Sequence, residues 1–497
     1  MTPRPVIMVV DDLWGRADDP MIESNYGSLP VTWIKETALG PSGFCAKVVL
    51  AAIASRKPAL LLLDISFGAP SDRLGTEILT QIRSQYPVLP VLMFTSLDSV
   101  GNRETVIRCM ELGANEYVEK APSARRMQQL IAIYAAPGSH LALYGNSDPI
   151  RRLRADIARV AFGGDASVLI TGESGTGKEL VAQALHRQGP RNRGPMVVKN
   201  CASATAALLD IELFGHEKGA FPGAMDARQG LIEQADGGVL FLDEISDMVP
   251  ELQGKLLRTL ETRTFRRIGG TRDLQSRFQL VCATNRPLND LLATNRLRPD
   301  FYYRIASVIL DVPPLRDRPG DVRILVERFV SYFRAQGGSS YPGRRFTPET
   351  LRRLEQHTWP GNARELRNVV ERALIMSREP DISLAELPLL ASPEHGPANA
   401  LSETPARPDL PEDPALWSVT RLRTELEYAV QARMAVERYK GASWKAEFMR
   451  LMYPEYKAAN AKGFADLIKR FTGGPWGDPR WRDHPEITNL LSRLSDR

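Results

Sequence analysis

Short runs of apolar residues alternate with longer mixed segments along the first two thirds of the chain. In its first part these runs are Pro5–Val10, Leu60–Leu63, Val91–Phe94 and Tyr117–Val118, and further on they are Val168–Thr171, Gly238–Leu242 and Phe278–Cys282. Continuous apolar runs of this length, separated by helix-length segments, predict buried parallel strands joined by helices. The sequence therefore predicts a multidomain α/β protein.

The last quarter of the chain follows a different pattern. Proline is dense over 386–415, with glutamate, alanine and serine and little apolar periodicity, which predicts an extended linker. Apolar residues then return at helical spacing from Trp417 to Tyr439, and two further helical segments follow. We therefore expect a small all-α domain over 416–497.

Length and charge refine this division. A chain of 497 residues suggests about three or four domains. We expect a first α/β domain over 1–135 and a second over 140–385, whose α/β core runs to about 315 and is followed by a helical lid. The net charge is +5, and the segment from Ala415 to the end alone carries 15 Lys and Arg against 10 Asp and Glu. The three helical segments have the lengths of a helix-turn-helix, so together with this surplus they favour a DNA-binding domain over 416–497. A small helical bundle for dimerisation or partner binding is the open alternative.

Polar residues stand at the strand ends of the first domain. They are Asp11 and Asp12, Asp64, Thr95 and Lys120. Because the carboxyl ends of parallel strands share one edge of a sheet, these side chains are expected to converge there. The carboxylates would hold a divalent metal, Asp64 would accept a phosphoryl group, and Thr95 and Lys120 would contact it.

With GANEYVEKAP near its end, this set resembles the receiver domain of bacterial response regulators, which has a flavodoxin-like fold. The resemblance implies phosphorylation of Asp64 by a cognate histidine kinase, with Thr95 and Tyr117 in the conformational switch. Any one of the acids alone would be better explained as a strand-end cap. All five polar residues in the right order favour the receiver.

The segment VLITGESGTGKE, from Val168 to Glu179, predicts a strand, a glycine-rich turn and a helix start. Such a turn cradles phosphates with backbone N–H groups, and the lysine reaches the terminal phosphates. The residues expected to bind ATP are Gly172, Glu173, Ser174, Gly175, Thr176, Gly177, Lys178 and Glu179. Since Glu179 replaces the usual Ser or Thr, the hydroxyl ligand for Mg²⁺ is missing, and the metal must be held mainly from elsewhere.

Two further strand ends supply the rest of a nucleotide site. Asp243 and Glu244 follow the run GVLFL, and Asn285 follows the run that ends at Cys282. Asp243 is expected to hold Mg²⁺, Glu244 to deprotonate the attacking water, and Asn285 to sense the γ-phosphate. The sequence therefore predicts an ATPase.

A larger set of motifs makes the resemblance of the second domain specific. NCASATAALLDIELFGHEKGAFPGA, GGVLFLDEI, ATNRPL, LRPDFYYRI, DVPPLRDRPGDV and WPGNARELRN occur in this order. Together they resemble the AAA+ domain of the bacterial enhancer-binding proteins that activate sigma-54 RNA polymerase. With the receiver in front, the chain resembles a response regulator of the nitrogen-regulation type.

The resemblance implies roles for four more residues and several partners. Asn200 matches the asparagine that pairs with the catalytic acid Glu244, Arg298 and Arg304 match the arginine fingers, and Arg364 matches the second sensor. An arginine finger acts on the nucleotide of the neighbouring subunit, so ATPase activity is expected to need a homo-oligomeric ring, which we expect to be a hexamer. The expected partners are sigma-54 RNA polymerase, enhancer DNA and the histidine kinase.

The loop that contacts the sigma factor departs from the family pattern. The family reads GAFTGA, and here the loop is Gly219, Ala220, Phe221, Pro222, Gly223 and Ala224. Proline fixes φ and removes both an N–H and the threonine hydroxyl, while the Phe221 ring remains. Sigma-54 coupling is the leading hypothesis. The alternatives are a DNA-binding regulator independent of sigma-54, in which ATP serves assembly only, and a remodeller of a non-transcriptional partner.

The four cysteines are far apart and show no paired spacing, which argues against a disulfide framework or a zinc site. No apolar segment is long enough to span a bilayer, and the N-terminal apolar run is too short for a signal peptide. We therefore expect a cytoplasmic protein without a membrane partner.

Overall fold

The computed structural model describes residues 4–383, apart from 18, 41–42, 68–73, 96–99, 137–141, 223, 338–342 and 378. The expected linker at 386–415 and the expected helical domain at 416–497 lie outside the described residues, as does Gly223.

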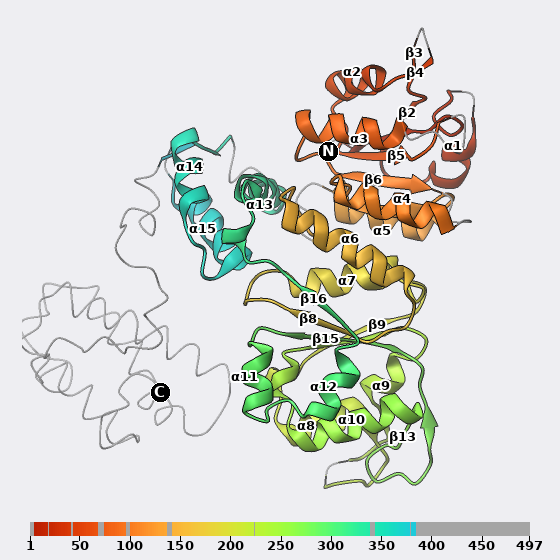
Figure 1. Ribbon diagram of the computed structural model, residues 1–497, viewed down its shortest axis with the longest axis vertical. Coiled ribbons are helices and arrows are strands. Elements are labelled where there is room, and N and C mark those ends of the chain that lie inside the picture. Colours follow the sequence, from red (N-terminus) through yellow and green to blue (C-terminus); the bar gives the residue numbers. More distant parts are fainter. Residues whose placement is uncertain are drawn as a thin grey trace, which may run out of the picture. The chain divides into compact units, whose positions relative to one another are not determined.

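The first domain is built on a parallel five-stranded sheet (Figure 1). Its strand order is β2 (Thr32–Glu36), β1 (Val6–Val10), β5 (Leu60–Asp64), β6 (Val91–Thr95) and β7 (Glu116–Glu119). The helices are α1 (Met21–Tyr26), α2 (Ala46–Arg56), α3 (Leu74–Gln85), α4 (Val100–Glu111) and α5 (Ala124–Tyr134), and a small hairpin pairs β3 (Leu39–Gly40) with β4 (Gly43–Phe44).

Alternate residues of each central strand pack on opposite faces of this sheet. Met8 and Leu61 belong to the core that includes α2, α3 and α4, whereas Ile7 and Leu62 belong to the core that includes α1 and α5. Both faces are therefore covered, which explains why these strands are apolar throughout.

The second domain has its own parallel sheet. Its order is β16 (Val308–Asp311), β8 (Val168–Thr171), β15 (Gln279–Thr284), β12 (Val239–Asp243) and β9 (Met196–Asn200). Around it lie α6 (Asp148–Phe162), α7 (Lys178–Gln188), α8 (Ala206–Phe214), α9 (Leu231–Gln234), α10 (Pro250–Thr262), α11 (Leu288–Ala293) and α12 (Pro299–Ile305).

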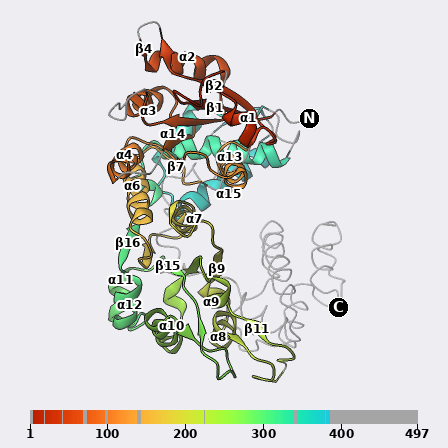
Figure 2. The same cartoon turned by 90° about the vertical axis from the view of Figure 1, so that its right-hand side faces the viewer.

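Figures 1 and 2 show α6 and α7 on one side of this sheet and α8 and α10 on the other. Val168 and Phe241 belong to the core with α6 and α7, and Leu169 and Leu240 belong to the core with α8 and α10. The central strands β8, β12 and β15 are almost fully buried, so their polar chemistry lies at the strand ends.

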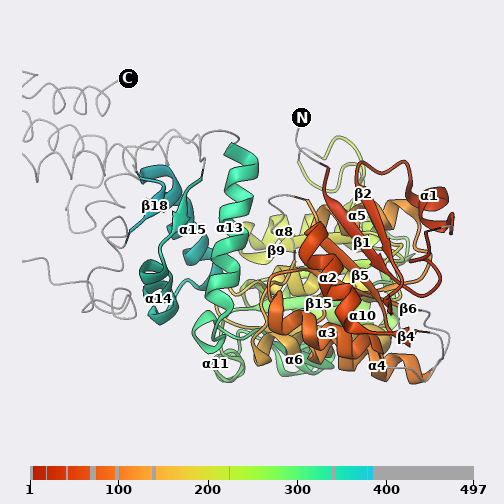
Figure 3. The same ribbon diagram turned by 90° about the horizontal axis from the view of Figure 1, so that it is seen from above.

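After β16 the chain forms a helical lid. The 3₁₀ turn η3 (Leu315–Asp317) leads to α13 (Asp321–Gly337), α14 (Pro348–Gln356) and α15 (Asn362–Met376), which lie together in Figure 3. Short β17 (Arg345–Phe346) pairs with β18 (Asp381–Ile382). The predicted α/β fold, with two parallel sheets and a helical lid, is confirmed. Within the described residues, no helix combines the length and hydropathy that a membrane span requires.

Candidate functional site

The phosphate loop joins the end of β8 to the start of α7. Gly175 and Gly177 have φ of +79° and +104°, conformations that favour glycine. The side chain of Lys178 is buried and donates hydrogen bonds to the carbonyls of Gly172 at 2.9 Å and Glu173 at 3.2 Å. Burial lowers the pKa of Lys178. The lysine and the N-terminus of α7 together form an anion site.

Two neighbours of the lysine complete the local hydrogen bonds of the loop. Thr176 Oγ1 donates to the carbonyl of Glu173 at 2.8 Å. Glu179 accepts a hydrogen bond from Gln183 on the same helix at 3.2 Å and lies at an exposed position.

The acids at the end of β12 differ in backbone conformation. Asp243 is the last residue of the strand, while Glu244 has φ of +51°, a left-handed conformation outside the strand. Burial raises the pKa of Glu244, and the charge of Lys178 opposes that shift. Glu244 Oε2 accepts a hydrogen bond from the backbone N–H of Asn285 at 3.4 Å. An acid with a raised pKa beside a phosphate loop is suited to take a proton from water.

The side chain of Asn200 forms a hydrogen bond with Asp243, whereas the family resemblance implied a pairing with Glu244. Its Nδ2 donates to Asp243 Oδ2 at 3.2 Å, and its Oδ1 accepts from the backbone N–H of Ala202 at 2.9 Å. The register explains this, because Asn200 and Asp243 lie directly opposite each other on adjacent strands β9 and β12.

Three arginines expected in the site fall into two groups. Arg364 Nη1 donates to Ser174 Oγ in the phosphate loop at 3.2 Å. Arg298 instead pairs with Asp300 at 2.6 Å, and Arg304 donates to the carbonyl of Leu260 at 3.0 Å. These two partners lie on α12 and α10, and neither belongs to the phosphate loop.

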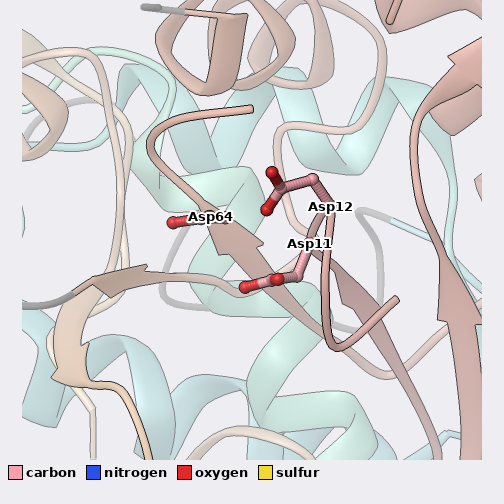
Figure 4. Close-up of side chains that lie close together, drawn as sticks. All are labelled: Asp11, Asp12 and Asp64. Carbon is pink, nitrogen blue, oxygen red and sulfur yellow. The ribbon is translucent and has the colours of Figure 1, made fainter. Parts of the chain in front are cut away.

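The acids of the first domain converge as expected. Asp11, Asp12 and Asp64 each offer a carboxylate oxygen within 4.8 Å of the others (Figure 4). Lys120 Nζ lies 2.8 Å from Asp11 Oδ2 and 2.9 Å from Asp64 Oδ2. Burial, with the nearby charge of Asp11, raises the pKa of Asp64 to about 6. Thr95 ends β6 opposite Glu119, and its side chain is outside the described set.

Tyr117, on β7 three residues before Lys120, contacts the second domain. Its ring stacks on Phe162 with centroids 5.0 Å apart, and its hydroxyl donates to the carbonyl of Gln188 at 2.9 Å. Gln188 is the last residue of α7, the helix that begins with Lys178. The residue expected in the switch therefore contacts the helix of the phosphate loop.

Sequence reasoning missed the neighbouring Glu116, which is fully buried. It accepts hydrogen bonds from Tyr134 at 2.6 Å and from Arg126 and Arg187 at 3.1 Å. Arg187 belongs to α7, so a buried ion pair joins the two domains. Glu116 is the first residue of the short strand β7, EYVE, and its position next to an apolar pair was the available signal.

The loop at 219–224 stands on a short hairpin of β10 (Gly215–His216) and β11 (Arg228–Gln229). The Gly219 N–H donates to the carbonyl of Ala224 at 2.9 Å, which closes the loop. The Phe221 ring meets the ring of His216 edge to face, with centroids 5.0 Å apart, and Pro222 is exposed. The loop is therefore a closed projection with an aromatic ring packed against its base.

Three family models match the chain. They are the response regulator receiver domain over 44–132, the Sigma-54 interaction domain over 143–311 and the AAA+ ATPase lid domain over 316–403. These matches include Asp64 of the acid cluster, the phosphate loop and the three helices of the lid.

Several known proteins are similar to this chain over most of its length. The transcriptional regulatory protein ZraR of Klebsiella oxytoca is 40% identical over 342 residues, which are 66% of this chain and 75% of ZraR. The response regulator protein PilR of Pseudomonas aeruginosa is 36% identical over 353 residues, 69% of this chain and 78% of PilR. The crystal structure of NtrX from Brucella abortus is 30% identical and covers 94% of this chain and 99% of its own, with a TM-score of 0.48.

The identity and coverage of ZraR and PilR, with matches to a receiver, a Sigma-54 interaction domain and a lid in the same chain, establish the family. The chain belongs to the sigma-54-dependent response regulators, in which a receiver domain is joined to an AAA+ ATPase that activates transcription.

Proposed function

We propose that phosphorylation of Asp64 by a cognate histidine kinase controls the assembly of these chains into a ring, which we expect to be a hexamer. The ring hydrolyses ATP to remodel sigma-54 RNA polymerase. The observation that carries the proposal is the set of contacts that the nucleotide residues and the two arginines make within the single chain. The phosphate loop and acids are assembled, while Arg298 and Arg304 hold partners on α12 and α10. A neighbouring chain would supply these arginines.

Within this site each residue has a distinct role. Lys178 and the loop N–H groups bind the phosphates of ATP, and Asn285 senses the γ-phosphate. Glu244 takes the proton from the attacking water, since its raised pKa favours that transfer. Arg298 and Arg304 neutralise the charge that develops on the neighbouring chain's nucleotide.

Mg²⁺ fits the carboxylates at the strand ends of both parallel sheets. Oxygen ligands suit this ion, and the close set of Asp11, Asp12 and Asp64 would hold one in the receiver, while Asp243 would hold another beside ATP. When bound, the ion supplies positive charge for phosphoryl transfer. Asn200, bonded to Asp243, would fix the orientation of that carboxylate.

The remaining partners follow from family membership. The loop at 219–224, with Phe221, would contact sigma-54, the helical segment at 416–497 would bind enhancer DNA, and the protein would act in the cytoplasm. Pro222 makes the loop tip rigid and leaves the aromatic ring in place.

A complementation experiment tests the shared site. Glu244→Gln removes the base and Arg304→Ala removes the finger, so each purified variant alone should lose most of its ATPase activity. In an equal mixture, the intact arginine of the first variant can enter the intact nucleotide site of the second. Such fully functional interfaces form about a quarter of the total, so about a quarter of the wild-type rate should return.

A mixture of Glu244→Gln with Lys178→Ala is the matched control, because both changes disable the nucleotide-binding side. That mixture should stay inactive. If the first mixture also stays inactive while native mass spectrometry shows mixed rings, the arginine does not act in trans and the proposal is wrong.

A further inference from the structure

Glu173, the residue after Gly172 in the phosphate loop, is held from outside the loop. Arg316 donates to its two carboxylate oxygens at 2.9 Å and 2.6 Å, a bidentate pair. Arg316 lies on η3, the turn that connects the core sheet to the lid. This hydrogen bonding to Arg316 lowers the pKa of Glu173, so the carboxylate stays ionised.

Asn362, at the start of α15, joins the same cluster. Its side chain is fully buried, and its Nδ2 donates to Glu173 Oε2 at 3.1 Å and to the carbonyl of Ser174 at 3.0 Å. Its Oδ1 accepts a hydrogen bond from the backbone N–H of Leu315 in η3 at 2.7 Å. One amide therefore links the phosphate loop, the connecting turn and the lid.

The lid also contacts the loop directly at this point. A Cβ atom at Gly175 would lie 2.4 Å from the carbonyl oxygen of Gly361, so only glycine allows this approach. Arg364, two residues after Asn362, bonds to Ser174. The position of the sensor arginine is thus tied to the first turn of α15.

We propose that Glu173, Arg316 and Asn362 form a lid clamp, a set of positioning residues that holds the start of α15, and with it Arg364, against the nucleotide phosphates. Arg316 also offsets the negative charge of the Glu173 carboxylate, which lies in a loop that binds anions. The clamp concerns the nucleotide site alone and requires neither a ring nor sigma-54.

The clamp should affect nucleotide affinity more than stability. The side chains of Arg316 and Glu173 are 44% and 41% exposed, and ion pairs this exposed contribute little to folding. Arg323 and Glu355 form a matched pair within the lid, 3.4 Å apart and 50% and 31% exposed. Arg323→Gln is therefore the control for Arg316→Gln.

The experiment measures the binding of a fluorescent ADP to the full chain by anisotropy, together with the melting temperature. Arg316→Gln should weaken binding about tenfold, equivalent to about 1.4 kcal/mol, and Arg323→Gln less than about twofold. Both melting temperatures should stay close to that of the wild type. Equal affinities in the two variants, or a large loss of melting temperature in Arg316→Gln alone, would overturn the proposal.

Two further variants separate positioning from general damage. In a Glu173→Gln background, Arg316→Gln should weaken ADP binding by less than about threefold, because no uncompensated carboxylate remains. Asn362→Asp tolerates the φ of +53° and keeps the acceptor for Leu315, but replaces the donor to Glu173 by a carboxylate. It should weaken ADP binding as Arg316→Gln does. Additive losses in the first test, or unchanged affinity in the second, would contradict the clamp.

Discussion

The raised pKa of Asp64 predicts a pH-dependent affinity of the receiver for Mg²⁺. Burial and the charge of Asp11 raise this pKa from 3.8 to about 6. Because the metal binds the ionised carboxylate, protons compete with it below about pH 6. With a pKa of about 6, only about a tenth of Asp64 is ionised at pH 5, so Mg²⁺ should bind about tenfold more weakly there than at pH 8.

Isothermal titration calorimetry of the full chain measures this dependence. Asp243→Asn should be present throughout, so that the ATPase site does not contribute to the heat. An ordinary pKa of 3.8 would lower the affinity between pH 8 and pH 5 by only about 6%, well separated from the predicted change. A flat affinity down to pH 5 would refute the reasoning, and Asp12→Asn should abolish the signal if the three acids form the site.

Three other perturbations have defined outcomes. Glu244→Gln should retain ATP binding and lower hydrolysis at least about a hundredfold, measured by phosphate release, because the base is removed while the phosphate loop is unchanged. Pro222→Thr should leave ATP turnover within about twofold of wild type, since Pro222 is exposed on the loop of the β10–β11 hairpin and is not part of the phosphate loop; a large loss would contradict that independence. Arg187→Met should destabilise the chain by about 3 kcal/mol in urea unfolding, because it leaves the buried Glu116 with a single arginine, whereas the exposed Arg152→Met should have almost no effect.

The central strands could be predicted from sequence because they are buried on both faces. Leu60–Leu63 and Val239–Leu242 are fully buried, so their apolar runs are uninterrupted, and the polar residues after them mark the strand ends. The edge strands β2 and β9 were missed. Their residues are mostly half-buried or exposed, and TWIKE and MVVKN mix apolar and charged positions.

Contacts between distant segments could not be predicted in the same way. The interaction of Glu116 with Arg187 and the clamp on Glu173 join residues far apart in sequence. The partner of Asn200 depends on strand register, which places it opposite Asp243. Spacing within a motif shows which residues reach one edge of a sheet, but the choice of hydrogen-bond partner depends on packing.

The most direct test of the account is transcription by purified sigma-54 RNA polymerase with this protein, ATP and an acyl phosphate donor. We predict open promoter complexes and transcript that require ATP hydrolysis and disappear with Glu244→Gln. A protein that hydrolyses ATP and binds its DNA site, but gives no transcript until Pro222 is replaced by Thr, would contradict sigma-54 coupling by the native loop. Promoter output unchanged by Glu244→Gln would contradict the role of hydrolysis.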